Sequence, residues 1–477
     1  MIFSSYKFLL GFFPVTTILY WVFNALNWTE LAKIELIVAS FFFYSQGSPK
    51  FFPFFLGSVL ANYVAGITLI RLQEDRWKVQ RKVILAITVI ANVALLGYYK
   101  YLNFFIENVN ALTGLDLPMK QLVLPIGISF FTFQLIAFVV DCYKGKTKKY
   151  DITEYLLFIT FFPQLIVGPI VHHAEITPQF EDHENMKFNW NNVALGIFIF
   201  AIGCGKKMIL ADPMNTSAAA FYGSLDGTQT MWECWYYTLQ YSISYYFDLS
   251  GYTDMAIGLA LFYNIHLPEN FNSPFKSRNM QEYWQRQHMT LSRFLGGYVF
   301  KSVFVKGSKW RNYYVATMVT FLVSGIWHGA GWSFIIWGLM NGVLVCWGAW
   351  EKYNKKYPPL AVGMILTFFA IVLTRVIFVA PSLSATWQVY RTMFDFGALA
   401  KAGWSTAGAA FIHFIKWHKR EELMILISLF ICYCMPNARA MREKFKPDWK
   451  HFLFTAAILG YCLMRMNKVV SFLYFQF

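Results

Sequence analysis

The chain has 477 residues, of which 57% are hydrophobic, 20% aromatic and only 14% charged, and its mean hydropathy is +0.41. A soluble globular domain averages roughly 45–50% apolar and about 25% charged residues, so this composition excludes an ordinary soluble protein. The formal net charge is +15, but no basic run forms a domain of its own, so a nucleic-acid-binding function is not expected. The composition predicts a polytopic membrane protein.

The apolar residues come in long blocks along the whole chain. Five of them, in order, are FLLGFFPVTTILYWVF (8–23), VILAITVIANVALLGYY (83–99), VALGIFIFAIGCG (193–205), YVATMVTFLVSGIW (314–327) and AVGMILTFFAIVLTRVIFV (361–379). A spanning helix needs roughly 17–25 residues, and counting all such blocks predicts about 11–13 membrane segments, some re-entrant or broken. The first block exceeds the apolar core of about 7–15 residues in a signal peptide, so it is predicted as a membrane helix. The predicted fold is an all-α membrane protein with one domain over residues 1–477.

Lysine and arginine gather in short loops such as 71–82, 143–149 and 351–357. The positive-inside rule places most of these loops in the cytoplasm. The seven cysteines lie mostly within apolar blocks, and Cys432-Tyr-Cys434 does not have the spacing of metal ligands. We therefore expect neither a disulfide nor a metal site.

Polar residues inside apolar blocks concentrate in the middle of the chain. LPIGISFFTFQLIAFVVDCYKG, FFPQLIVGPIVHHAE and YYFDLSGYTDMAIGLAL carry Pro and Gly together with Gln164, Asp248 and Asp254. Polar groups are costly in lipid, and broken helices are tolerated there only where protein or a watery cavity satisfies the backbone. The pattern predicts a central funnel, with these three residues as possible lining.

Two histidines stand out further along the chain. His288 lies in a polar stretch, whereas His328 is the only titratable residue of the apolar stretch FLVSGIWHGAGWSFIIWGLMNG. They are 40 positions apart (328 − 288), so they meet only if the fold brings them together. Histidine suits general-base chemistry at neutral pH, although a lone membrane histidine is often a satisfied core residue. Gly325, Gly329 and Gly331 leave room beside His328 for a ligand or for another backbone.

Five ordered motifs resemble the signatures of the membrane-bound O-acyltransferases. They are LPIGISFFTFQ, FFPQLIVGPIV, YYFDLSGYTDMAIGLAL, NFNSPFKSRNMQEYWQRQHMTLSRFL and SGIWHGAGWSFIIWG, dense over about residues 120–345. The resemblance is closest to the bacterial branch that includes the alginate, peptidoglycan and cellulose acetylation proteins AlgI, PatA and WssH and the D-alanylation protein DltB. It implies that His288 and His328 are the two signature histidines and that His328 is essential for transfer. Trp284, Ser324 and Trp327 beside them are expected to line the funnel.

Two positions depart from the family pattern. The stretch before His288 has Gln285 where many members have arginine, while Arg286 remains. Arg375 precedes the position of the usual Phe-Phe-Arg-Ala arginine by a few residues. The resemblance therefore does not assign the residues that bind the donor.

The end of the sequence, FLYFQF, resembles an aromatic motif of the bacterial acyltransferases in which a tyrosine takes the acyl group transiently; here that tyrosine is Tyr474. The nine residues 469–477 are too few to span a bilayer again. Fully extended, they still reach about 30 Å at roughly 3.3 Å per residue, enough to enter a cavity. The alternative is an aromatic belt that anchors the last helix at the interface.

The resemblance implies an O-acyltransferase, above all an acetyltransferase, in the bacterial cytoplasmic (inner) membrane. Its donor would be a cytoplasmic thioester, acetyl-CoA or an acylated carrier protein, with no bound cofactor. Its acceptor would be a cell-envelope or exported polysaccharide of the alginate, cellulose or peptidoglycan type. The chain contains no Gly-Asp-Ser-type hydrolase motif, so an extracytoplasmic SGNH/GDSL-type acetyltransferase or esterase is the expected partner. A polysaccharide synthase or export complex is a further possible partner.

Three alternatives stay open. Transfer could run directly from thioester to acceptor at His328 with Tyr474 structural, or the acyl group could be D-alanyl. A multi-span transporter of the acyl donor or polysaccharide would also need a polar cavity. A transporter requires no essential histidine, so a His328→Ala variant separates that class from an enzyme.

Overall fold

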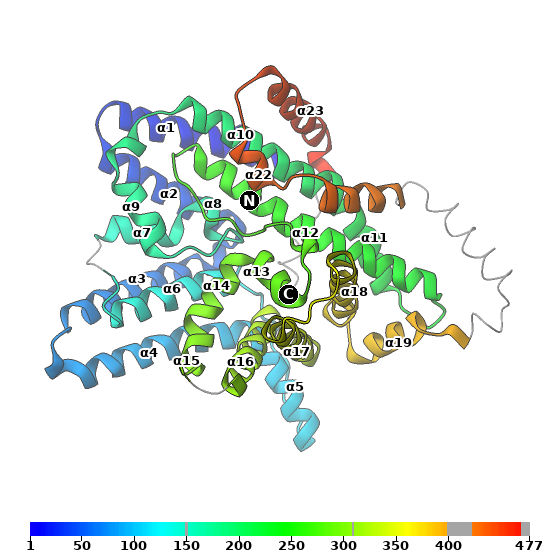
Figure 1. The fold of residues 1–477 in the computed structure, drawn as a ribbon. Coiled ribbons are helices and arrows are strands. Elements are labelled where there is room, and N and C mark those ends of the chain that lie inside the picture. Colours follow the sequence, from blue (N-terminus) through cyan, green and yellow to red (C-terminus); the bar gives the residue numbers. More distant parts are fainter. Residues whose placement is uncertain (148–150, 308–309, 398–421, 469–477) are drawn as a thin grey trace. The chain divides into compact units, whose positions relative to one another are not determined.

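The computed structural model describes residues 1–147, 151–307, 310–397 and 422–468, and these residues form helices and no strands (Figure 1). Within them, six helical stretches are long and apolar enough to cross a membrane: Lys7–Ala25, Pro49–Arg71, Asp75–Thr113, Trp190–Gly223, Trp332–Asn354 and Leu360–Val379. The predicted all-α, multi-pass membrane fold is confirmed. Other apolar helices are shorter, such as Ile128–Tyr143, so the number of membrane segments stays a prediction. Tyr474 and the rest of the tail, 469–477, lie outside the described residues.

The chain divides into two compact units that interleave along the sequence. Unit 1 comprises Met1–Ile202, Tyr252–Pro268 and the described residues from Phe445 on, and unit 2 comprises Gly203–Gly251 and Glu269–Lys444. Two helices, α10 (Trp190–Cys204) and α12 (Met231–Leu261), run from one unit into the other. A single domain stays a prediction.

Unit 1 is built from packed apolar helices with a few polar contacts between them. Its helices are α1 (Phe13–Ala25), α2 (Thr29–Gly47), α3 (Phe52–Arg71), α4 (Lys78–Leu96), α5 (Leu102–Thr113), α6 (Ile128–Tyr143), α7 (Ile152–Thr160), α8 (Phe162–Leu165), α9 (His173–Glu181) and α23 (Trp449–Arg465). Asn62 of α3 and Asn92 of α4 are buried and exchange hydrogen bonds of 3.1 and 2.8 Å. Such side-chain amide pairs hold membrane helices together where lipid provides no hydrophobic driving force.

The predicted helix breaks are present in unit 1. Gly127 has a φ of +75° and precedes α6, and a side chain there would press against the backbone of Ile166. Pro163 lies in the first turn of α8, which is only four residues long. Both breaks use a residue whose backbone is suited to leaving or starting a helix.

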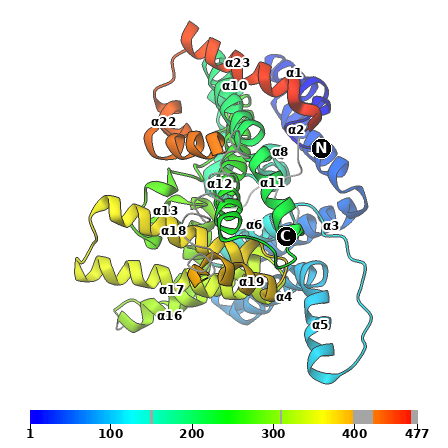
Figure 2. The same cartoon turned by 90° about the vertical axis from the view of Figure 1, so that its right-hand side faces the viewer.

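Unit 2 contains both histidines. Its helices are α11 (Asp212–Gly223), α13 (Met280–Arg286), α14 (Met289–Leu295), α15 (Lys301–Val303), α16 (Trp310–His328), α17 (Trp332–Asn354), α18 (Leu360–Val379), α19 (Leu383–Met393), α22 (Ala438–Glu443) and an unlabelled helix at Glu422–Cys434. Helices α16, α17 and α18 lie side by side (Figure 2). Where α16 crosses α17, a Cβ on Gly325 would lie 2.4 Å from the Phe334 carbonyl oxygen, and one on Gly338 would lie 2.4 Å from that of Phe321. This crossing therefore requires glycine on both helices.

Candidate active site

His328 is the last residue of α16 and is 2% exposed. Its Nδ1 lies 2.7 Å from the carbonyl oxygen of Ser324, one helical turn earlier. Because a carbonyl only accepts, Nδ1 carries the proton and donates it. In the neutral ring, Nε2 is then the nitrogen that carries the basic lone pair, as general-base chemistry requires.

Three aromatic side chains surround the His328 ring. The ring centres of Trp337 on α17 and of Trp327 lie 4.7 and 4.8 Å away, and that of Phe378 on α18 lies 5.8 Å away. Trp337 and Phe378 also contact each other, at 5.1 Å. This aromatic box, made by Trp327, Trp337 and Phe378, fixes the imidazole and keeps its surroundings apolar.

Two of the glycines beside His328, Gly325 and Gly329, do not leave an empty space, whereas a Cβ on Gly331 would meet only ordinary contacts at 3.6 and 3.8 Å. The room beside Gly325 is taken by the backbone of α17, which is one of the two predicted uses. A Cβ on Gly329 would lie 2.1 Å from the ring of Phe334, so a side chain occupies that space.

His288 precedes α14 in the left-handed region, with φ 49° and ψ 51°, and is 4% exposed. A residue with a side chain adopts this conformation only when its surroundings enforce it. Its Nδ1 lies 3.2 Å from Asn270 Oδ1, which also accepts from the Thr290 backbone N–H and hydroxyl. Burial lowers the pKa of the His288 imidazole to about 3, so this ring is neutral at pH 7.

The fold brings the two histidines into contact with one tryptophan. The ring centre of Trp327 lies 6.2 Å from that of His288 and 4.8 Å from that of His328. Sequence reasoning predicted all three residues for the site but not that Trp327 contacts both histidines. Their catalytic roles stay predictions.

A cavity of about 310 Å³ adjoins this arrangement. Trp284 and Ser324, both predicted as lining, are part of its wall, and so is Gln285. Hydroxyl-bearing residues recur along the α16 side of the cavity: Tyr313, Thr317, Thr320 and Ser324. His288, Trp327 and His328 are not among the residues that line it, and Ser324, whose carbonyl accepts from His328, connects the cavity wall to the candidate base.

Asp248 is not among the residues that line this cavity. Its carboxylate lies 2.5 Å from Lys207 Nζ, and the same nitrogen lies 2.8 Å from Asp212 Oδ1. All three side chains are less than one tenth exposed. We call Lys207, Asp212 and Asp248 the Lys207 cluster. Its ion pairs give Asp248 a structural role inside unit 2, in addition to the predicted role as funnel lining.

Gln164 and Asp254, the other predicted lining residues, belong to unit 1. Both are buried, and Gln164 Nε2 donates to the Phe158 carbonyl at 2.6 Å while its Oε1 has no partner in the described part of the chain. Whether they line the funnel stays a prediction. Within the described ranges no group of three or more His, Cys, Asp or Glu is placed to hold a metal.

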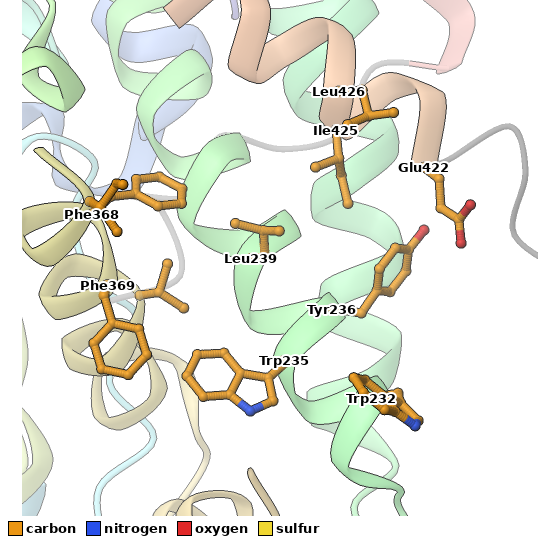
Figure 3. A pocket seen from close by; sticks show the side chains of 11 residues that line it. Trp232, Trp235, Tyr236, Leu239, Phe368, Phe369, Glu422, Ile425 and Leu426 are labelled. Atoms are coloured by element: carbon orange, nitrogen blue, oxygen red, sulfur yellow. The ribbon is translucent and has the colours of Figure 1, made fainter. Parts of the chain in front are cut away.

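A larger cavity of about 520 Å³ lies between α12, α18 and the Glu422–Cys434 helix. Its lining is apolar and aromatic apart from Glu422, and Figure 3 shows Trp235, Leu239 and Phe369 directed into it. It contains neither histidine. The larger cavity therefore offers mainly apolar contact, whereas the wall of the smaller cavity includes Ser324, whose carbonyl accepts a hydrogen bond from His328.

Sequence reasoning missed several residues that build the site. Trp337, Phe378 and Asn270 lie within recognised segments, but aromatic and amide side chains are common there and nothing singles them out. Lys207 left a usable signal, because it is a charge inside the apolar run GCGKKMILA.

Comparisons with known proteins agree with this picture. The profile described as MBOAT, membrane-bound O-acyltransferase family, matches residues 54–350. The chain is 35% identical to the peptidoglycan O-acetyltransferase of Helicobacter pylori over 100% of this chain and 98% of that protein. It is 33% identical to the probable alginate O-acetylase AlgI of Pseudomonas aeruginosa over 83% and 75%. It is 32% identical to the teichoic acid D-alanyltransferase of Bacillus subtilis over 54% and 67%.

Proposed function

The chain belongs to the membrane-bound O-acyltransferase family and is an O-acyltransferase. We propose that it moves an acetyl group from a cytoplasmic thioester across the bacterial inner membrane, where the group acylates a cell-envelope polysaccharide. Peptidoglycan is the first acceptor to test, since the relative named for it is similar over nearly its whole length. Alginate-type polysaccharide is the second. D-alanyl transfer has less support, because that similarity covers about half of this chain.

The observation that carries this proposal is the orientation of His328. The Nδ1–H bond to the Ser324 carbonyl leaves Nε2 as the base. In the proposed reaction Nε2 takes the proton of a hydroxyl nucleophile, whose oxygen attacks the thioester carbonyl. The C–S bond then breaks, and the departing thiolate takes the proton back from the imidazolium.

His288 has a different role in this proposal. It is neutral and donates through Nδ1 to Asn270, so it orients the donor or helps to place the proton rather than providing charge. The second histidine thus contributes less to the rate than the first.

The nucleophile is proposed to be Tyr474, which relays the acyl group. A thiol has a pKa near 8.5 and a phenol near 10, so an acyl group on the phenol oxygen keeps much of its activation. A tyrosyl ester therefore remains able to acylate an alcohol. An SGNH/GDSL-type acetyltransferase or esterase outside the membrane is the proposed recipient, with a polysaccharide synthase or export complex as a possible further partner.

The proposal is tested on the purified full-length protein incubated with acetyl-CoA or with an acetylated carrier protein. Mass spectrometry of the carboxy-terminal peptide should show one added acetyl group on Tyr474. The His328→Ala variant should lack it and should consume donor about 10²–10⁴-fold more slowly, the usual contribution of a general base.

The Tyr474→Phe variant distinguishes relay from direct transfer. If it consumes donor and acetylates polysaccharide at the wild-type rate, the acyl-tyrosine step is wrong and transfer is direct at His328. If His328→Ala retains full activity in a reconstituted export assay, the protein acts as a transporter and the enzymatic mechanism is wrong.

A further inference from the structure

Arg375 is a buried cation in the apolar helix α18, and the residue is 3% exposed. Its guanidinium carbon lies 3.8 Å from the ring centre of Tyr245 and 5.3 Å from that of Phe378. Nη2 donates one long hydrogen bond of 3.4 Å to the Tyr283 hydroxyl. Nε and Nη1 are buried and have no hydrogen-bond partner within the described residues.

This cation also lacks a counter-ion among the residues that the structure describes. In the described part of the chain no carboxylate forms a salt bridge with Arg375, whereas Lys207 has two. A charged side chain at membrane depth is costly and is normally paired or functional. Stacking on Tyr245 recovers part of that cost, but it satisfies neither Nε–H nor Nη1–H. These donors suit an anion that is present only during the reaction.

Arg375 shares a neighbour with the candidate base. Phe378, on the next turn of α18, contacts the Arg375 guanidinium at 5.3 Å and the His328 ring at 5.8 Å. Trp337 contacts both Phe378 and His328. The guanidinium and the imidazole are therefore neighbours of the same aromatic box.

We propose that Arg375 binds the oxyanion that forms on the acyl carbonyl during transfer; this inference rests on the proposed function. When the hydroxyl oxygen bonds to the carbonyl carbon, His328 Nε2 takes the hydroxyl proton and the C=O electron pair moves onto oxygen. Arg375 donates to that negative oxygen. The C=O bond then re-forms, the C–S bond breaks, and the thiolate leaves with the proton from His328.

The anion is the reacting carbonyl rather than a phosphate of the donor. In both candidate donors the pantetheine arm separates the phosphate from the thioester. A phosphate beside the aromatic box would therefore place the thioester away from His328. Fixed donors that face a developing oxyanion in a dry site act mainly on the transition state, so the effect belongs in kcat.

The test uses full-length protein in detergent with whichever of acetyl-CoA or acetylated carrier protein the wild type consumes. For Arg375→Met we expect kcat to fall about 10²–10³-fold, the usual loss for an oxyanion donor, with a change in KM below about threefold. Arg375→Lys keeps a charge but not the planar donor array, so its kcat should be intermediate. Thr374→Val, which removes a neighbouring buried hydroxyl on α18, is the matched control and should behave like wild type.

A second readout separates chemistry from folding. A trifluoromethyl ketone analogue of the donor, which hydrates to a tetrahedral oxyanion mimic, should bind Arg375→Met more weakly by the same factor as the fall in kcat. Unchanged kcat in Arg375→Met overturns the inference. So does a raised KM alone, which indicates donor binding. A fall in kcat that is accompanied by a fall in melting temperature, while the affinity for the analogue is unchanged, also overturns the inference. If wild type consumes no donor in a His328-dependent way, the proposed function fails and this inference fails with it.

Discussion

Among the described residues of unit 2, two cations are buried in apolar surroundings, and their environments are opposite. Lys207 lies between Asp212 and Asp248, at 2.8 and 2.5 Å. Arg375 lies on the ring of Tyr245, with no carboxylate bound in the described part of the chain. Two carboxylates compensate the charge of Lys207, whereas no carboxylate among the described residues pairs with Arg375.

The difference separates a structural charge from a functional one. A buried ion pair adds little net stability, but removing one partner leaves an uncompensated charge. A buried arginine without a counter-ion already carries that cost, so removing it relieves the fold. Loss of Lys207 should therefore damage folding, and loss of Arg375 should damage the reaction.

The largest effect is expected for Lys207→Met. It leaves the carboxylates of Asp212 and Asp248 buried without a cation, which costs about 3–5 kcal/mol of folding free energy. We expect little folded protein, measured by yield and by melting temperature in detergent. The combined variant Lys207→Met, Asp212→Asn and Asp248→Asn removes all three charges and should recover much of the stability. A Lys207→Met protein that melts like wild type but does not transfer would instead place this cluster in the reaction.

The next largest effect is expected when a carboxylate is placed beside Arg375, because an ion pair would prevent the guanidinium from binding the oxyanion. Tyr245→Glu introduces a carboxylate where the ring now lies against the guanidinium. The new ion pair should reduce kcat about 10²-fold, as removal of an oxyanion donor does, while the melting temperature holds. Donor consumption and thermal unfolding are measured together. Tyr245→Phe keeps the ring and should stay within about threefold of wild type. Equal turnover in Tyr245→Glu and Tyr245→Phe would contradict the assignment.

A smaller effect is expected at His288. His288→Gln should lower kcat about 10-fold, below the range of about 10²–10⁴-fold for general acid–base groups, because His288 positions the reactants and does not act as the base. The rate should fall as pH decreases, because a protonated His328 accepts no proton. His288 remains neutral down to about pH 3, so the midpoint of this acid limb should be the same in wild type and His288→Gln. A shifted midpoint in His288→Gln would show that the two histidines titrate as a pair.

The helices were predictable from the sequence because blocks of about 20 apolar residues satisfy their backbone in a membrane only as helices. The broken helices at Gly127 and Pro163 were predictable from the glycine and proline themselves, which interrupt a helix. The group that fills the space beside Gly325 could not be predicted from the sequence. A glycine permits the approach of either a ligand or a backbone, and only the crossing with Gly338 shows which one is present.

The candidate site was predictable in its residues but not in its pairings. His288 and His328 could be identified by their motifs, whereas their common neighbour Trp327 depends on a contact across 40 positions. Arg375 is the only charge in its apolar block, so its depth could be predicted. The absence of a carboxylate beside Arg375 in the described part of the chain could not be predicted, because from the sequence Asp248 could have paired with Arg375. In the structure Asp248 pairs with Lys207.

The smallest kinetic effect is expected at Phe369, on the same helix as Arg375 but in the wall of the larger, apolar cavity. Its ring stacks on Trp235 at 5.4 Å, and such pairs contribute about 0.5–1.5 kcal/mol beyond burial. Phe369→Ala should therefore lower the melting temperature but leave kcat within about twofold of wild type. Arg375→Met should show the reverse, with reduced kcat and no loss of melting temperature. The two variants of α18 thus test whether stability and turnover depend on different regions of unit 2. If Phe369→Ala slows donor consumption as strongly as Arg375→Met does, the apolar cavity takes part in the reaction and Arg375 acts through packing.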